Sequence, residues 1–316
     1  MDTSQRNIQI EKDIRKQALD LNIKRVLVAL SGGADSIATA FLLKKINLDI
    51  SALHCNFHLR GEESNRDTDF VTEFCDSYDI PIKIKNFNVS HYIQHHKGLS
   101  VEMACRELRH KWFEEELTLC SFDRIATGHN ADDNIETFLL NCLRGSGTRG
   151  LRAMDVDNGK IWRPLLKLPK SDIIVLLNDY NVSYVVDSTN LSTDYRRNYL
   201  RNIIIPLLKK EWKGFDSALN RTIKNLESEN KIVEYSINKI LSRSHNCLTV
   251  KEIIEFPAPL LLIKRFIEIL GPYVKTPEEI FAAIKANKPH IRSWNLRNGK
   301  VLLQNGRLFI KMGHSE

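Results

Sequence analysis

The hexapeptide SGGADS at residues 31–36 has the residue types and spacing of a phosphate-binding loop. It follows the apolar run Val26 to Leu30 and precedes a helix-like stretch. The two glycines allow a ligand to approach closely, so backbone N–H groups can converge on an anion where a helix begins. Asp35 stands where a Walker A loop would carry lysine, and a carboxylate beside a triphosphate predicts a bridging Mg²⁺. The alternative is a Gly-Gly turn whose Asp and Ser only cap the next helix.

A second group of chemistry-bearing residues lies in the segment TGHNADDNIET at 127–137, which follows another apolar run and begins a helix. Asp133 and Glu136 stand at i, i+3 and share a helical face, with Asp132 close by. Such carboxylates can bind Mg²⁺, or receive an ammonium group and later accept its proton so that the amine becomes a nucleophile. They could also serve only the helix dipole. His129 is either a general base or leaving-group contact, or a structural residue.

Two further basic groups could contact phosphate. Arg106 and Arg109 share a face of the helix predicted over Val101 to Leu117, where two guanidinium groups could grip phosphate. Alternatively, Glu102 could pair with Arg106 along that helix. The segment RGSGTRG at 144–150 is predicted to be a flexible basic loop, or a Gly-rich surface linker.

The order of elements indicates how these residues are brought together. Helix-like segments alternate with strand-like runs at Val26–Leu30, Ile50–His54, Ile82–Phe87 and Arg124–Thr127. This alternation predicts an α/β fold with a doubly wound parallel sheet, whose strands end at one rim where ligands bind. Further helices are expected at Lys170–Tyr180 and Asp194–Lys210, and Lys213-Gly214 marks a predicted boundary. We therefore expect a catalytic domain over residues 1–213.

A smaller, mainly helical domain is expected over residues 214–316. Its helices are predicted near Ser217–Ser242, Pro259–Leu270 and Pro277–Ala286, and Asn305-Gly306 predicts a type I′ turn in a closing β-hairpin. No Asp or Glu occurs from Ile280 to Ser315, whereas seven basic residues do: Lys285, Lys288, Arg292, Arg297, Lys300, Arg307 and Lys311. This asymmetry favours RNA contact over a solvated basic face.

Composition sets broader limits. The chain has 316 residues, 42% of them hydrophobic, and a formal charge of +7, which favours a polyanionic partner. No apolar run is long enough to span a membrane and the charged N-terminus is unlike a secretory signal, so we expect no membrane association and a cytoplasmic protein. The six cysteines are scattered, with no Cys-x-x-Cys pair, and support neither a disulfide framework nor a zinc site.

Taken together, several blocks resemble the tRNA(Ile)-lysidine synthetases of the PP-loop ATP pyrophosphatase superfamily. The blocks are SGGADS, ALHCNFHLRGEES, ELRH, ATGHNADDNIETFLLNCLRGSGTRGLRAM, RPLL and DSTNLSTDYRRNYLRN, and they cover most of residues 24–210. SGGxDS alone indicates only the superfamily, whereas the carboxylate block running into RGSGTRGL is far more specific. The resemblance implies that ATP adenylates the wobble cytidine of a minor tRNA(Ile) with a CAU anticodon, releasing pyrophosphate. The ε-amine of L-lysine then attacks the same carbon and expels AMP, leaving lysidine.

The resemblance also assigns roles. Asp133 and Glu136 would handle lysine, Arg106 and Arg109 would contact ATP or the activated intermediate, and Asp35 would hold Mg²⁺. Asp132 would either complete the metal site or join the lysine-handling pair. Arg197 and Arg201 would face the substrate, unless they pair with Asp194. The loop Arg144 to Arg149 would approach tRNA, and the family suggests a homodimer. The residues expected to bind the nucleotide are Ser31, Gly32, Gly33, Ala34, Asp35, Ser36, Gly128 and His129.

Three departures from the family pattern, and three rival functions, bear on these assignments. Phe57-His58 replaces the usual His-Gly, and Asn130 replaces a second histidine. We also expect the second C-terminal module of longer members to be missing, which predicts fewer tRNA contacts. Cytidine thiolation would need the missing Cys-x-x-Cys ligands. Small-molecule amidation, as in an NAD synthetase, is disfavoured by the basic C-terminus and the missing glutaminase segment. A non-enzymatic tRNA-binding module would leave Asp35, Asp133 and Glu136 unexplained.

Overall fold

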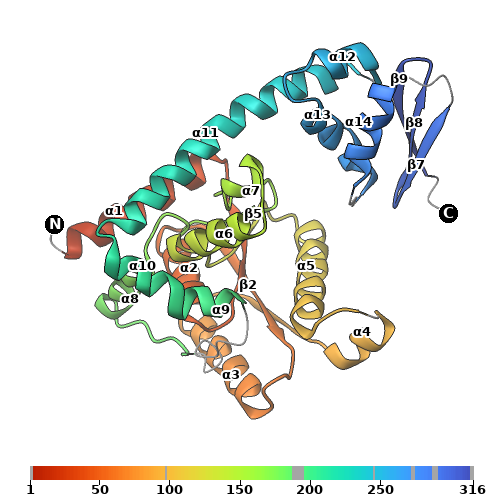
Figure 1. Cartoon of the computed structure of the whole chain (residues 1–316). Helices are drawn as coiled ribbons and strands as arrows, with labels where there is room; N and C mark the ends of the chain where they lie inside the picture. Colours follow the sequence, from red (N-terminus) through yellow and green to blue (C-terminus); the bar gives the residue numbers. More distant parts are fainter. Residues whose placement is uncertain are drawn as a thin grey trace. The chain divides into compact units, whose positions relative to one another are not determined.

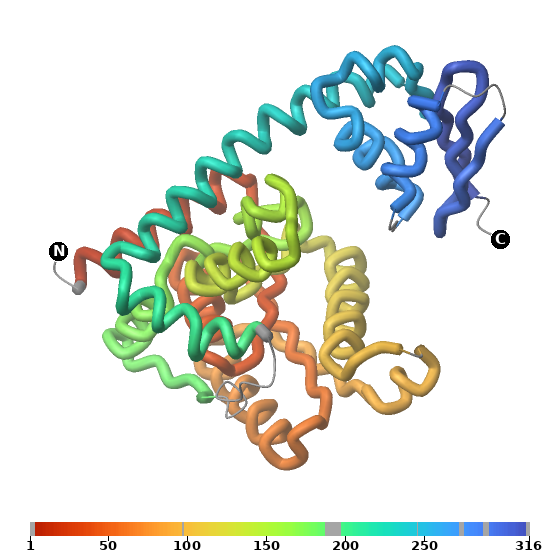
Figure 2. Tube along the Cα trace, viewed as in Figure 1, coloured from red at the N-terminus to blue at the C-terminus, as the bar shows by residue number. Residues whose placement is uncertain are grey.

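The computed structural model describes residues 3–96, 98–186, 196–244, 246–271, 275–286 and 291–313. The chain forms two compact units, residues 1–224 and 225–316 (Figures 1 and 2). The division between the units lies within the long helix α11 (Phe215–Leu241), whereas the boundary expected after residue 213 lies just before this helix. The assignment of a catalytic and a tRNA-contacting domain to the two parts stays a prediction. In the described part of the chain, no helix is both long and apolar enough to cross a membrane.

The first unit is built on a parallel sheet of five strands in the order β3-β2-β1-β4-β5. The central strand β1 carries Val26, Leu27 and Val28, each at most 1% exposed, as expected for a parallel strand covered on both faces. The doubly wound parallel sheet predicted from the sequence is confirmed. Its strands are β1 (Arg25–Ala29), β2 (Asp49–Asn56), β3 (Ile82–Asn86), β4 (Arg124–Ala126) and β5 (Ile161–Trp162).

Side-chain alternation along β1 divides the helices between the two faces of this sheet. Val26 and Val28 belong to a core shared with α1 (Thr3–Asp20), α2 (Ala34–Lys45), α3 (Glu62–Ser77) and α8 (Lys170–Asp179). Leu27 belongs to a second core with Trp112 and Phe113 of α5 (Val101–Leu119). The remaining helices of this unit are α4 (Val89–His95), α6 (Ala131–Leu143), α7 (Thr148–Leu151), α9 (Arg196–Tyr199) and α10 (Ile205–Glu211).

The second unit packs helices against an antiparallel sheet in the order β6-β9-β8-β7. Asn305 and Gly306 have φ values of 50° and 68°, so they form the predicted I′-type turn between β8 and β9. The hairpin is therefore part of a four-stranded sheet rather than an isolated terminal element. The elements are α12 (Val250–Glu255), α13 (Pro259–Ile267), α14 (Thr276–Ala286), β6 (Cys247–Thr249), β7 (Arg292–Leu296), β8 (Gly299–Gln304) and β9 (Arg307–Met312).

Candidate active site

The strand order brings the two main sequence motifs together. Strand β1 lies between β2 and β4. The chain adds β2 and β3 on one side of β1 and then crosses to add β4 and β5 on the other side, so the strand order reverses at β1. Ligands bind open parallel sheets at such a switch point, beyond the carboxyl ends of the strands. The SGGADS loop follows β1 and the segment TGHNADDNIET follows β4. The two motifs therefore lie side by side at the rim.

The SGGADS loop is held open by its own backbone and hydroxyl groups. Gly32 has φ +87°, a conformation that favours glycine, and its carbonyl accepts a 2.9 Å hydrogen bond from the N–H of Val185. The hydroxyl of Ser36 donates to the Gly33 carbonyl at 2.9 Å and accepts from the N–H of Ser31 at 3.1 Å. These hydrogen bonds within the loop fix its conformation.

The loop leads directly into the N-terminus of α2. Gly33 is the N-cap residue and has no side chain to cap the helix. The Ile37 N–H donates a 3.0 Å hydrogen bond to the Gly33 carbonyl, which is the first bond of the helix. The N–H groups of residues 34–36 precede this bond and have no intrahelical partner. Together with the positive end of the helix dipole, they form a group of donors suited to phosphate.

Gly128 allows the β4 segment to lie directly against this loop. A Cβ atom built on Gly128 would sit 2.7 Å from the carbonyl carbon of Asp35 and 2.8 Å from the backbone nitrogen of Ser36. Backbone atoms cannot move aside as a flexible side chain can, so any larger residue would push the two segments apart. Close packing of the two motifs therefore requires glycine here.

Asn130 connects the two motifs through side chains. Its side-chain oxygen accepts hydrogen bonds from the N–H groups of Asp132 and Asp133 and caps α6, and Asp133 completes a capping box. Its Nδ2 donates to Asp35 at 3.1 Å. Asn130 thus caps the carboxylate helix and also contacts the phosphate loop.

Two lysines neutralise the carboxylates expected to hold a metal. Lys170 Nζ lies 2.7 Å from Asp35, and the Lys170 backbone N–H donates to Asp132 at 2.7 Å. The other oxygen of Asp132 lies 3.0 Å from Lys209 Nζ. Burial acts to raise the pKa of Asp132, but the hydrogen bonds from the Lys170 N–H and from Lys209 outweigh it, so the pKa lies below its ordinary value. No group of three or more His, Cys, Asp or Glu residues suited to a metal occurs among the described residues.

Asp133 and Glu136 bind two arginines from a later helix. Arg197 donates to Glu136 at 2.8 Å and to Asp133 at 3.2 Å. Arg201 donates to Glu136 at 2.5 and 2.9 Å and to Asp133 at 2.8 Å. The Glu136 side chain is only 2% exposed, whereas the arginines are 39% and 37% exposed. In this cluster the Glu136 carboxylate is therefore buried, and the guanidinium groups lie nearer the solvent.

The backbone that carries these arginines is irregular. A π-helical segment, Leu200–Ile204, joins α9 to α10 and contains Arg201. Such segments are rare and occur frequently at functional sites. Asp194, the alternative partner that the sequence suggested for these arginines, lies outside the described residues.

Burial dominates the protonation behaviour of Asp133. It raises the pKa of this carboxyl above its ordinary value, against the lowering effects of the Asn130 N–H and Arg197; the neighbouring Glu136 adds to the increase. A carboxyl whose pKa is raised toward neutrality is better suited to accept a proton from a bound ammonium group.

His129 lies within a group of arginines. Its Nδ1 is 2.8 Å from the Thr127 hydroxyl. Burial, together with the positive charges of Arg163, Arg197, Arg109 and Arg106, lowers the pKa of His129 to about 3. The imidazole is therefore neutral at physiological pH, and the surrounding guanidinium groups form a positive field at the rim.

Sequence reasoning did not single out Arg163 or the two lysines. Burial lowers the pKa of Arg163, and its Nε is buried without a hydrogen-bond partner among the described residues. Arg163 stands at the end of β5 in the RPLL block, which was a usable signal. Lys170 and Lys209 lie in ordinary helical patterns, which gave no indication of their contacts.

The basic segment at 144–150 is more ordered than the predicted flexible loop. Asn141 donates a side-chain hydrogen bond of 2.8 Å to the Gly150 carbonyl, and residues 148–151 form the short helix α7. The loop follows α6 directly, so its position relative to the carboxylate helix is fixed. Its contact with tRNA stays a prediction.

Comparisons with known proteins agree with this geometry. The PP-loop domain family matches residues 4–208. A tRNA(Ile)-lysidine synthase of Parabacteroides distasonis is 39% identical over 274 residues, 86% of this chain and 62% of the relative. A tRNA(Ile)-lysidine synthase of Chlorobaculum tepidum is 34% identical over 73% of this chain and 71% of the relative. The U34-tRNA thiolase NcsA from Methanococcus maripaludis has a similar fold, with a TM-score of 0.56, 23% identity and coverage of 69% of this chain and 79% of that chain.

The fold and the loop after β1 thus define the class of PP-loop proteins. The chain belongs to the PP-loop family and, within it, to the tRNA(Ile)-lysidine synthase family. It spans about three fifths of the length of the Parabacteroides distasonis relative.

Proposed function

We propose that this protein uses ATP to attach L-lysine to the wobble cytidine of a tRNA(Ile) with a CAU anticodon, giving lysidine, AMP and pyrophosphate. The observation that carries the proposal is the direct link between the phosphate loop and the carboxylate helix, through Asn130 and Asp35. This arrangement brings a nucleotide and an amine to one rim. The family to which the chain belongs supports the same reaction.

In the first step the cytidine carbonyl oxygen attacks the α-phosphate of ATP and pyrophosphate leaves. Residues 31–36 bind the phosphates through the backbone N–H groups at the start of α2. Arg106 and Arg109, with Arg163, stabilise the charge that develops on the phosphates and on the leaving pyrophosphate. Gly128 keeps the nucleotide close to the carboxylate helix.

The residues around Asp35 fit a magnesium ion. Mg²⁺ is usually bound by one or two carboxylates together with substrate phosphates and water, so Asp35 and the triphosphate suffice. The ion supplies charge neutralisation between phosphate oxygens. The oxygens of both carboxylates accept hydrogen bonds, those of Asp132 from Lys170 and Lys209 and those of Asp35 from Asn130 and Lys170. We propose Asp35 as the main protein ligand because it belongs to the loop that binds the phosphates, and the Lys170 ammonium would move away from Asp35 when the ion binds.

In the second step the lysine ε-amine attacks the activated carbon and AMP leaves with the cytidine oxygen. Free lysine carries two ammonium groups and a carboxylate at neutral pH. Asp133 and Glu136 match an ammonium, and Arg197 and Arg201 match the carboxylate. To bind, lysine would replace some of the ion pairs between these arginines and carboxylates with ion pairs of its own. The raised pKa of Asp133 suits it to take the proton that the amine must lose.

The test is incubation with ATP, radiolabelled lysine and an unmodified tRNA(Ile) transcript with a CAU anticodon. We expect label in the tRNA only when ATP is present. A transcript with a CCU anticodon serves as the substrate control. ATP turnover with tRNA but without lysine incorporation would contradict the proposal and favour another PP-loop reaction, such as thiolation. Binding of tRNA without ATP turnover would instead indicate a non-enzymatic module.

A further inference from the structure

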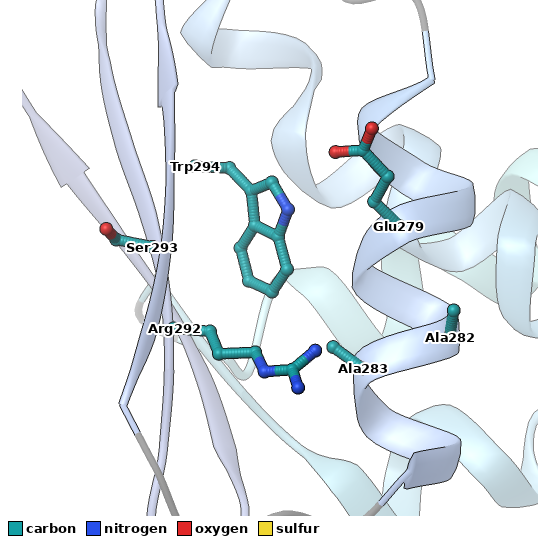
Figure 3. A pocket seen from close by; sticks show the side chains of 6 residues that line it. All are labelled: Glu279, Ala282, Ala283, Arg292, Ser293 and Trp294. Atoms are coloured by element: carbon teal, nitrogen blue, oxygen red, sulfur yellow. The ribbon is translucent and has the colours of Figure 1, made fainter.

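The sheet of the second unit has one covered face and one open face. Arg292 and Trp294 of β7 point toward α14, whereas Ser293 points to the other side of the sheet (Figure 3). The covered side includes a hollow of about 470 Å³ whose lining includes Glu279, Arg292 and Trp294. Along β8 and β9 the same alternation places Val301, Leu308 and Ile310 in the core.

The open face presents an apolar row between two basic rows. Leu302 is paired with Phe309 in the register, and both are half-buried at the centre of the sheet. On one side of this row Lys300 is paired with Lys311, and on the other Arg307 is paired with Gln304. Adjacent rows on one face are two residues apart, or about 7 Å.

The charge on this face is not balanced. Lys300, Lys311 and Arg307 are exposed and form no ion pair with any described residue. Two lysines directly opposite one another on neighbouring strands destabilise a sheet. Residues 291–313 contain no Asp or Glu, and the described acids of this unit lie on its helices. Charge complementarity therefore calls for an anionic partner.

We propose that this open face binds an unpaired stretch of RNA, one base stacking on Phe309 while Lys300, Lys311 and Arg307 contact phosphates. An aromatic ring on a sheet, flanked by cations, suits a base and its backbone better than an acidic peptide, which would leave Phe309 unused. The inference rests on tRNA being the substrate in the proposed function. Beyond the proposed function, we assign the RNA to one face of the sheet in the second unit and name the side chains that would contact it.

The experiment measures binding of the full chain to the unmodified tRNA(Ile) transcript over a range of salt concentrations. We expect the double variant Lys300→Gln, Lys311→Gln to bind more weakly and to lower the slope of log affinity against log salt by about 1.4, or about 0.7 for each lost phosphate contact. Phe309→Leu keeps an apolar side chain but removes the ring, and should weaken binding about 5-fold or more.

The matched control is Lys231→Gln, Lys251→Gln, which removes the same charge from exposed lysines that are paired with glutamates on helices. It should leave the slope unchanged. Thermal unfolding checks that each variant is folded. Wild-type affinity and slope for the Lys300, Lys311 variant, or equal losses in the control, would overturn the proposal. If the Lys300, Lys311 variant bound poly-glutamate more weakly but tRNA as tightly as wild type, the proposal would be overturned and an acidic protein would be the partner. Lysine incorporation is measured separately, so failure of the proposed reaction would be distinguishable from failure of this surface.

Discussion

At the scale of residues, the main result is the pairing of Asp133 and Glu136 with Arg197 and Arg201. A buried carboxylate without a partner is costly, so the arginines stabilise these carboxylates before substrate arrives. Their partial exposure keeps the cluster accessible from the rim. The same four charges provide complementary partners for both ends of a zwitterion.

Replacing Asp133 with Asn tests its role in binding lysine. The variant keeps the size of the side chain but loses the charge, and a hydrogen bond to a charged group is worth about 1.5–3 kcal/mol. We expect the KM for lysine to rise about 10- to 100-fold while the KM for ATP stays near the wild-type value. Steady-state kinetics with each substrate varied in turn would measure both.

The control is Asp13→Asn, at an exposed carboxylate of α1 that accepts a side-chain hydrogen bond from Gln9 in the same helix. It should leave both KM values unchanged. If Asp133→Asn used lysine as wild type does, the assignment of the amine site would be wrong.

At the scale of elements, the site depends on how closely the segment after β4 approaches the N-terminus of α2. We expect Gly128→Ala to lower kcat/KM for ATP about 100-fold, because its Cβ would overlap backbone atoms of Asp35 and Ser36 and displace the phosphate loop by about 1 Å. Kinetics would be measured on protein shown by circular dichroism to be folded.

Gly147→Ala provides the matched control for this substitution. Gly147 has φ −75°, and a Cβ there would meet nothing within 4 Å. Its kcat/KM for ATP should equal that of wild type. Unchanged ATP kinetics in Gly128→Ala would show that close approach of the two segments is not needed.

Much of this element-level arrangement could be predicted from sequence. Periodicity and the position of glycines predict the first four strands to within two residues of their observed ends, and parallel topology then brings the two motifs to one rim. Strand β5 has two residues, too few to produce a recognisable pattern. Strands β6 and β7 were likewise not predicted, because their pairing depends on distant parts of the chain.

The long-range ion pairs could not be predicted for a related reason. Lys170 is separated from Asp35 by 135 residues, and Arg201 from Glu136 by 65. Nothing in a local helical pattern indicates which distant carboxylate a lysine will meet. The π-helical segment that carries Arg201 lies inside a stretch whose sequence predicts one continuous helix.

At the scale of the whole molecule, the two units carry different chemistry. The first unit holds the phosphate loop and the carboxylate cluster, and the second holds a basic sheet. Ile280, Ile284 and Val301 belong to the core of the second unit, so deleting the basic C-terminal segment would remove part of that core. Substitution of surface charges is therefore the sounder way to test its role.

In the proposed function, the phosphate loop and the carboxylate cluster serve a single reaction. Measuring AMP release and lysine incorporation together, with tRNA(Ile) carrying a CAU anticodon, tests this coupling. We expect one AMP for each lysine attached to tRNA, with no ADP formed. ADP as the product, or AMP release that continues with no lysine entering the tRNA, would contradict it.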